Sequence, residues 1–122
     1  MSMLRTVFSL AAEHDFELEG LDIDAAYLNA PVIEELFVRL PSEFSHFSRD
    51  MPFVCLLRKS QYGLKQSGRN WNNTLDDFIV GIGLDRSTTN PYLYFSRDVG
   101  EEKYILVAVC ADDLIISGRV KK

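Results

Sequence analysis

The sequence predicts an α+β fold in which two helices pack on one face of a mostly antiparallel sheet. Three observations predict it. Apolar residues recur at helical spacing in two segments, near residues 3–14 and after Gly63. Between these segments, short runs alternate apolar and polar residues as half-buried strands do. Towards the C-terminus, three strand-like runs follow one another with short connections, which is typical of an antiparallel meander.

The N-terminal part is expected to form a helix and then a strand. The buried stripe of this helix is predicted to contain Leu4, Val7, Phe8 and Ala11. From Phe16 the apolar residues alternate with polar ones, and the alternation slips in phase at Gly20. Asp22 and Asp24 are therefore expected on one face of the strand, which ends before Pro31 because proline cannot donate to a strand ladder.

The middle of the chain is expected to hold two short strands and the second helix. Residues 36–40 and 53–57 are the predicted strands, and residues 42–52 are a predicted loop. Ser67 is a possible N-cap of the helix, which is expected to end near Gly81. The apolar face of this helix is predicted to contain Trp71, Leu75, Phe78, Ile79 and Ile82.

The C-terminal third is expected to be the meander. The runs 92–97 and 104–110 are rich in aromatic and β-branched residues and are separated by a turn-forming segment, which predicts a hairpin. Residues 114–117 are expected to form the next strand. Only residues 111–113 separate it from the run before it, so the connection must be a tight turn.

The composition predicts a single domain over residues 1–122 and leaves its oligomeric state open. The hydrophobic fraction of 47% and the charged fraction of 25% are those of an ordinary globular protein. No apolar run approaches the roughly 20 residues that span a bilayer, so we expect no membrane segment and an intracellular location, cytoplasmic or nuclear. Cys55 and Cys110 lie in apolar contexts and are expected to be reduced core residues.

The charge of the chain limits its binding partners. A net charge of −5 argues against strong binding of nucleic acid by this chain alone, because such domains neutralise phosphates with clustered Lys and Arg. A local exception is an acid-free segment that contains Arg58, Lys59, Lys65 and Arg69. Composition alone favours a solvated face over a phosphate site for these four residues.

Most acidic pairs in the sequence have an ordinary explanation. Asp76 and Asp77 fall away from the apolar face of the second helix and are expected to be solvated. The pairs 34–35 and 101–102 lie beside predicted turns and are expected to be solvated too. The pair 112–113 differs because the apolar runs ILVAV and LII flank it. A tight turn and a chemical role both suit that pair, and the stretch alone does not decide between them.

Asp22 favours the chemical role. It lies among apolar residues in GLDIDAAYLN, so the chain twice places acids beside core-type strand residues. If the two strands are neighbours, Asp22 converges with Asp112 or Asp113. Carboxylates brought together repel, and a divalent cation offsets that repulsion; oxygen ligands favour Mg²⁺ or Mn²⁺. Two such ions about 4 Å apart stabilise an in-line displacement at phosphorus, which indicates phosphoryl transfer.

Three blocks of this sequence match a known family in order and spacing. They are LDIDAAYLNAPVIEELFVRLPSEF, VCLLRKSQYGLKQSGRNW and ILVAVCADDLIISG. With these blocks the chain resembles the reverse transcriptase domain of copia-type retrotransposon polyproteins. The resemblance implies part of the fingers and most of the palm of an RNA-directed DNA polymerase, with a palm-like sheet.

The resemblance also implies roles for individual residues. Asp22, Asp112 and Asp113 match the acids that hold two Mg²⁺ ions while a primer 3′-hydroxyl attacks the α-phosphate of a deoxynucleotide. Tyr27 matches the aromatic residue that rejects a ribose 2′-hydroxyl, although a half-buried core aromatic explains it equally well. Residues 61–66 match a segment against the nucleotide and template and also suit a turn before the helix. From this part of the chain, the implied contacts to nucleotide or nucleic acid are Tyr62, Gly63, Lys65, Gln66 and Arg69.

The sequence departs from the family pattern at four positions. Cys110 and Ala111 replace an aromatic residue and a valine, which makes the wall beside the primer end smaller and is expected to weaken primer positioning. Asp24 adds negative charge near the implied triphosphate, and Ala30 replaces a glycine. The upstream basic strands, the primer grip, the thumb and the ribonuclease H domain of the family are not in this sequence, and its acidic balance agrees with that.

Three functions therefore compete. The first is a polymerase fragment whose parent copies RNA into DNA with template-primer and deoxynucleotide as partners, and which alone shows little or no activity. The second is a catalytically silent remnant of a retroelement, acting at most as a binding or interaction module. The third is a small metal-dependent nuclease, which explains the carboxylates but not the YGLKQ block and ranks last.

Overall fold

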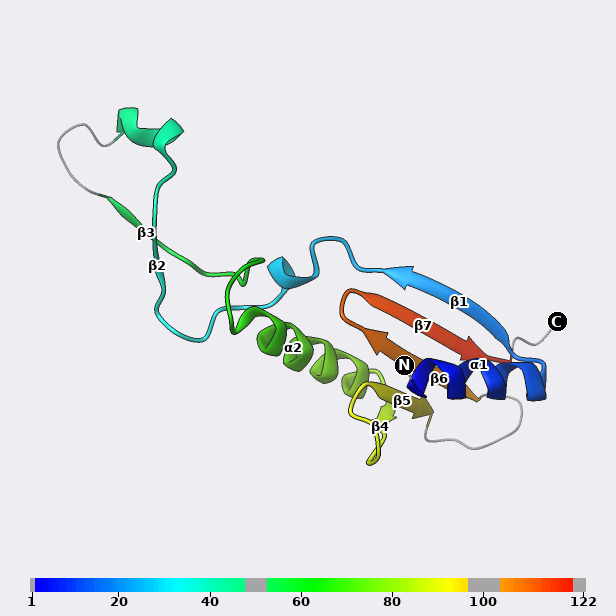
Figure 1. Ribbon diagram of the computed structural model, residues 1–122. Helices are drawn as coiled ribbons and strands as arrows, with labels where there is room; N and C mark the ends of the chain where they lie inside the picture. The colour runs from blue at the N-terminus through cyan, green and yellow to red at the C-terminus, as the bar shows by residue number, and fades with distance from the viewer. Residues whose placement is uncertain (1, 48–52, 97–103, 120–122) are drawn as a thin grey trace.

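The structure, a computed structural model, describes residues 2–47, 53–96 and 104–119. Its main element is a five-stranded antiparallel sheet with the strand order β1-β7-β6-β5-β4 (Figure 1). In that order the strands are β1 (Glu17–Asp22), β7 (Asp113–Gly118), β6 (Ile105–Cys110), β5 (Leu93–Ser96) and β4 (Leu84–Arg86). The helices are α1 (Ser2–His14), α2 (Ser67–Gly81) and the 3-10 helices η1 (Ala26–Asn29) and η2 (Ser42–Phe47). The predicted α+β class is confirmed, whereas the sequence analysis does not predict β4.

The predicted meander is also confirmed. β5 pairs with β6 and β6 pairs with β7, both antiparallel. Cys110 lies opposite Asp113, so a two-residue turn joins these strands. The predicted strand end at Arg97 and the acidic pair 101–102 lie outside the described residues.

β1 completes the sheet at one edge, next to β7. Its register runs without interruption from Glu17 opposite Gly118 to Asp22 opposite Asp113. Gly20 lies opposite Ile115 within that register, so the predicted slip in phase at Gly20 is wrong. The strand ends at Asp22, because the chain turns immediately afterwards into η1. Asp24 therefore lies in the turn and not on the strand.

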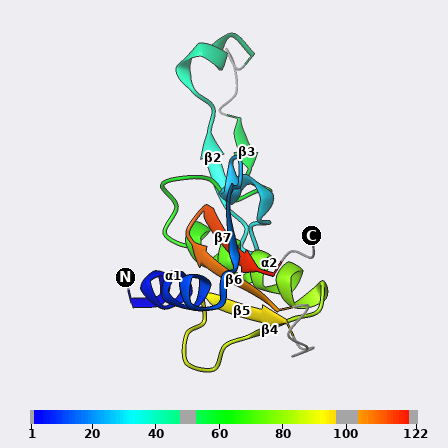
Figure 2. The ribbon, with the colours of Figure 1, turned by 90° about the vertical axis from the view of Figure 1, so that its right-hand side faces the viewer.

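The two helices cover opposite faces of the sheet, so the prediction that they share one face is wrong. Val107 and Val109 of β6 belong to one buried cluster with the inner face of α2. The alternate residues Leu106 and Ala108 point to the other face and are 3% and 0% exposed. α1 contacts β6 and β7, and Figure 2 shows α1 and α2 on either side of the sheet. The physical reason is that a strand which is apolar on both faces needs cover on both.

The inner face of α2 differs in part from the predicted one. Its buried residues are Ser67, Asn70, Trp71, Leu75 and Ile79. Phe78 and Ile82, which were expected there, are 63% and 62% exposed. Phe78 precedes Ile79 by one residue and is therefore rotated from it by about 100° around the helix. Ile82 lies at the C-cap, beyond the last helical turn.

α1 likewise buries a narrower stripe than expected. Val7 and Ala11 are buried, with exposed fractions of 0% and 3%. Phe8, which the spacing placed in the stripe, is 44% exposed. The contact of α1 with the sheet therefore depends on small side chains, which allow the helix to lie close to Ala108 of β6.

The strands β2 (Phe37–Arg39) and β3 (Val54–Leu56) form an arm that projects away from the five-stranded sheet (Figure 1). Both strands fall within the predicted ranges 36–40 and 53–57. Of the predicted loop 42–52, residues 42–47 form η2 and residues 48–52 lie outside the described part. On this arm Phe37, Val54 and Leu56 are exposed, whereas Val38 is half-buried. Cys55 is exposed here, so its prediction as a core residue is wrong; Cys110 is half-buried, and both thiols are free.

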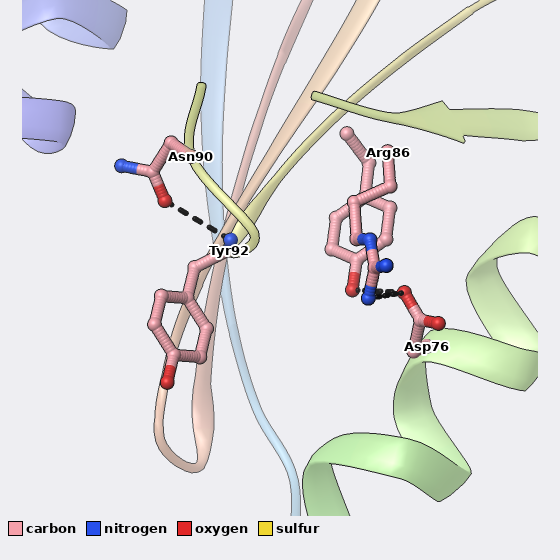
Figure 3. Close-up of polar contacts among 5 residues, drawn as sticks. Asp76, Arg86, Asn90 and Tyr92 are labelled. Carbon is pink, nitrogen blue, oxygen red and sulfur yellow. Dashed lines mark hydrogen bonds and ion pairs between the residues drawn. The ribbon is translucent and has the colours of Figure 1, made fainter. Parts of the chain in front are cut away.

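Asp76 is not solvated as predicted, because it links α2 to the sheet. The hydroxyl of Tyr94 donates a hydrogen bond of 2.8 Å to Asp76 Oδ1. Arg86 forms an ion pair of 3.4 Å with the same oxygen, and Figure 3 shows Arg86 beside Asp76. The Asp76 side chain is 26% exposed. Asp77, by contrast, is exposed as predicted, and so are both residues of the pair 34–35.

Replacing Tyr94 with phenylalanine is expected to lower the free energy of unfolding by about 1 kcal/mol, the usual net value of one hydrogen bond. Burial, followed by the hydrogen bond to Asp76, raises the pKa of Tyr94 above its ordinary value of 10.0. A raised native pKa stabilises the fold at pH values below 10, and this contribution is lost as the pH rises through the native pKa. Urea unfolding between pH 7 and 11 measures the effect.

The difference between wild type and Tyr94→Phe should therefore shrink above pH 10. Tyr92→Phe is the matched control, because the Tyr92 side chain is 47% exposed. A Tyr94→Phe variant with wild-type stability at pH 7 would show that this hydrogen bond contributes nothing.

Candidate active site

The sheet register brings two of the three predicted acids together. Asp22 at the end of β1 lies directly opposite Asp113 at the start of β7. Side chains of directly opposite residues point to the same face, with Cβ atoms about 5 Å apart. Both side chains are exposed. Two like charges at such positions destabilise a sheet unless a cation lies beside them, so this pairing is unfavourable as a purely structural feature.

Asp112 occupies the turn beside them. The turn consists of Ala111 and Asp112, and the backbone amide of Ile23 donates a hydrogen bond of 3.0 Å to the Asp112 carbonyl. Ala111 has a φ of 58°, in the region that residues with a Cβ rarely adopt. A two-residue hairpin turn requires a positive φ at its first residue, and here that residue carries a Cβ.

The Asp112 carboxylate has a direct partner. The hydroxyl of Tyr62 donates a hydrogen bond of 3.0 Å to Asp112 Oδ2. This bond raises the pKa of Tyr62 above its ordinary value, because the neutral phenol is the donor. The ring of Tyr62 also stacks on Tyr27, with 4.4 Å between the centroids. The two predicted nucleotide-binding aromatics therefore lie together, next to one predicted metal ligand.

Tyr27 is placed by the turn that follows β1. Ala25 has a φ of 49° and starts η1, which carries Tyr27 towards α2. A Cβ added to Gly68, in the first turn of α2, would lie 3.7 Å from the Tyr27 hydroxyl. A pocket of about 310 Å³ opens beside it. The pocket is lined by Tyr27, Gly68, Trp71, Asn72, Tyr92, Val109, Cys110 and Ala111. Tyr27 is half-buried, so its structural role as a packed aromatic is met at the same time.

The segment 61–66 forms the predicted turn before the second helix. Gly63 has a φ of 98°, which glycine adopts without strain. Gln66 is the N-cap residue of α2 but makes no capping hydrogen bond with its side chain. Ser67, the predicted N-cap, instead donates a hydrogen bond of 2.6 Å from its hydroxyl to the Gln61 carbonyl. This hydrogen bond joins the first residue of α2 to the start of the turn that precedes the helix.

The basic side chains of this region face solvent. Arg58, Lys59, Lys65 and Arg69 are all exposed. Exposure agrees with the solvated face that composition favours, and it also leaves Lys65 and Arg69 accessible to a phosphate. Their contacts with nucleotide or nucleic acid stay predictions.

The acids fit a divalent cation in donor type and backbone register, but their side chains are not gathered around one point. Within residues 2–47, 53–96 and 104–119, no three His, Cys, Asp or Glu side chains are arranged to hold a metal ion. Asp22 and Asp113 share a face, whereas the Asp112 carboxylate is engaged by Tyr62. Formation of a three-carboxylate site therefore requires these side chains to rearrange around a common point.

One residue at the turn was interpreted from the sequence only as a core residue. The indole N–H of Trp71 donates a hydrogen bond of 3.1 Å to the Ala111 carbonyl. Trp71 is 4% exposed and lies in the α2 cluster. The indole N–H of a buried tryptophan usually has a hydrogen-bond acceptor. This rule predicts that Trp71 makes such a hydrogen bond. The identity of the acceptor depends on how α2 packs on the sheet.

Comparison with known proteins identifies the family of this chain. Residues 1–122 match the family described as reverse transcriptase (RNA-dependent DNA polymerase). The chain belongs to this reverse transcriptase family. No solved structure matches it. In the part of the chain that the structure describes, no helix is long and apolar enough to cross a membrane.

Curated relatives of this reverse transcriptase chain are retrotransposon polyproteins, which confirms the predicted relationship. The chain is 36% identical over 121 residues to the retrovirus-related Pol polyprotein from transposon TNT 1-94 of Nicotiana tabacum, covering 99% of this chain and 9% of that protein. It is 31% identical over 116 residues to the corresponding polyprotein from transposon RE1 of Arabidopsis thaliana, covering 94% of this chain and 8% of that protein. The polyprotein from transposon RE2 of the same plant matches equally, at 31% over 116 residues. The chain thus spans less than a tenth of these relatives.

Proposed function

We propose that this chain carries the acidic centre of a retrotransposon RNA-directed DNA polymerase, which transfers deoxynucleotides to a primer 3′-hydroxyl. The observation that carries the proposal is the register that sets Asp22 opposite Asp113, with Asp112 in the adjoining turn. The family membership supports it. Cations bound at this site offset the repulsion between the like charges of Asp22 and Asp113.

In this proposal Asp22, Asp112 and Asp113 hold Mg²⁺ or Mn²⁺. Bound ions of this kind neutralise charge on the phosphates and stabilise the attacking and leaving oxygens of the displacement. The residues of this chain supply oxygen donors from two adjacent strands and their turn. Because both strands belong to one sheet, the donors on them keep a fixed spacing without a mobile loop between them.

The aromatic pair and the segment before α2 form the proposed nucleotide side. Tyr27 lines the pocket beside the acidic turn, where a rigid ring can exclude a ribose 2′-hydroxyl. Tyr62 stacks on it, and its side chain is 55% exposed and so accessible from solvent. Gly63 and Gln66 shape the backbone of this segment. The exposed cations Lys65 and Arg69 are proposed to contact phosphates of the nucleotide and of the RNA or DNA template-primer.

The chain is proposed to correspond to part of the fingers and most of the palm, with little or no activity alone. Its acidic balance leaves few cations to hold a template. One observation also favours the second candidate, a catalytically silent remnant. The Asp112 carboxylate accepts a hydrogen bond from Tyr62. Among the described residues, no three acidic side chains are arranged to hold a metal ion.

Calorimetric titration of the chain with Mn²⁺ separates the two candidates. The polymerase centre is expected to bind Mn²⁺ at micromolar to millimolar concentration with a stoichiometry of one or two ions. Competition by Mg²⁺ is expected, because both ions prefer oxygen ligands. If the titration detects no binding even at several millimolar Mn²⁺, the silent remnant is the better description.

A further inference from the structure

We infer that Trp71 is a positioning residue for the acidic centre, acting through its indole N–H on the Ala111 carbonyl. This inference rests on the proposed function. The hydrogen bond measures 3.1 Å and joins the middle of the core to the turn that carries Asp112. Trp71 does not contact the reacting groups in this arrangement; its effect passes through the backbone of the turn.

Among the described residues, three hydrogen bonds reach the turn from outside the hairpin, and they come from partners of different burial. The Tyr62 hydroxyl reaches the Asp112 carboxylate from a side chain that is 55% exposed. The Ile23 amide reaches the Asp112 carbonyl from the edge strand side, just after β1 ends. The Trp71 indole reaches the Ala111 carbonyl from a side chain that is 4% exposed and fixed in the α2 cluster. Of these three, the Trp71 bond is the one that ties the turn to a packed helix.

The turn has a particular need for such support. Ala111 has a φ of 58°, and a residue with a Cβ keeps this conformation only when its surroundings determine it. Cys110 and Ala111 are small, and the pocket of about 310 Å³ lies against them. Side-chain packing on that side of the turn is therefore sparse. The directional bond from Trp71 fixes the backbone where packing does not.

The position of the turn sets the relation between the acids. Asp113 is held opposite Asp22 by the strand ladder. Asp112 has no ladder partner and follows the turn, so its carbonyl and carboxylate move when Ala111 relaxes to an ordinary φ. Outer partners that orient metal ligands typically change metal affinity by about 10–100-fold when removed. Trp71 bonds the backbone of Ala111 and not a carboxylate, so we expect a loss of metal affinity at the lower end of that range.

An isosteric exchange at position 71 tests the inference. Trp71 is the single tryptophan of the chain, so benzothienylalanine can replace it throughout a preparation without altering another site. This analogue keeps two fused rings but has sulfur in place of the N–H. Fluorotryptophan, which keeps the N–H, is the matched control. The readouts are hydrogen exchange of the Ile23 amide by NMR and Mn²⁺ affinity by calorimetry.

With benzothienylalanine, the Ile23 amide is expected to exchange at least about tenfold faster and Mn²⁺ affinity is expected to fall about tenfold. Fluorotryptophan should restore both values. Leu75→Ala controls for general destabilisation, because Leu75 lies in the same cluster but not at the turn. It should lower the melting temperature and leave Mn²⁺ affinity within about twofold of wild type.

The outcomes distinguish the inference from the function on which it rests. Unchanged Ile23 exchange with benzothienylalanine would overturn the positioning role, whatever the metal data show. If the wild-type chain binds Mn²⁺, equal Mn²⁺ affinity in the two analogues would overturn it as well. If exchange at Ile23 responds but the wild-type chain binds no Mn²⁺, Trp71 positions the turn and the proposed polymerase centre is the part that fails.

Discussion

Replacing Asp112 with asparagine is expected to weaken Mn²⁺ binding by this chain at least about tenfold and to remove any primer extension it shows. The carboxamide keeps the size of the side chain and one oxygen but loses the negative charge. Loss of a mere supporting partner of a metal ligand already costs about 10–100-fold, so loss of a ligand should cost no less. The measurements are calorimetric titration with Mn²⁺ and primer extension on an RNA template.

Asp77→Asn is the matched control for this change. Asp77 is an exposed acid on α2, so its replacement makes the same change in net charge away from the acidic turn. It is expected to leave Mn²⁺ affinity within about twofold of wild type, because an exposed charge acts only weakly through water and salt. Equal loss in both variants would mean that Mn²⁺ responds to overall charge and not to a site.

The primer-extension arm separates catalysis from contamination. Incorporation that Asp112→Asn removes would assign catalysis to this chain, contrary to the expectation that it shows little activity alone. Identical incorporation by wild type and variant would come from another enzyme in the preparation. Unchanged Mn²⁺ affinity in Asp112→Asn would exclude Asp112 as a ligand and leave only the pair Asp22 and Asp113 as candidates.

The backbone arrangement of these acids follows from local features of the sequence. A connection of only three residues between 104–110 and 114–117 permits only a tight hairpin turn, which places Asp112 and Asp113 at its tip. The apolar residues around Asp22 predict a strand there, but they do not predict which strand lies next to it. Such features act over a few residues, so they can be recognised without tertiary structure. The register of Asp22 opposite Asp113 adds the pairing of β1 with β7, which only the fold shows.

The side-chain partners of the acids could not be predicted in this way. Tyr62 reaches Asp112 from 50 positions away in the sequence. Trp71 reaches the Ala111 carbonyl across 40 positions. Asp76 looked solvated because helical spacing assigns it to the outer side of α2, yet Tyr94 and Arg86 meet it there. These contacts depend on where α2 lies against the sheet, and no local pattern contains that information.

The placement of the helices shows a different kind of error. The segment ILVAV at 105–109 has no polar residue on either face, which is a direct sign that both faces of β6 are buried. A sheet with one solvated face is the common arrangement in α+β folds, and it predicts both helices on one face. Here the local apolar pattern of β6 is the better guide than the general expectation for the fold class.

The position of α1 can be tested by placing a charge beneath it. Val7→Asp is expected to lower the free energy of unfolding by about 3–5 kcal/mol, the usual cost of an uncompensated buried charge. Val7 is 0% exposed, and its helix contacts β6 and β7 on the face opposite α2. Small domains have only about 5–15 kcal/mol of stability, so this change removes a large share of it. Urea unfolding followed by circular dichroism measures the change.

Phe8→Asp supplies the comparison that decides which face of α1 is buried. Phe8 is the next residue along the helix and is 44% exposed, so an aspartate there keeps its contact with water. Its expected cost is below about 1 kcal/mol, since exposed substitutions rarely exceed that value. The same residue type at neighbouring positions should thus differ several-fold in effect. If both variants are as stable as wild type, α1 does not cover this face, and the two-sided burial of β6 needs another element to explain it.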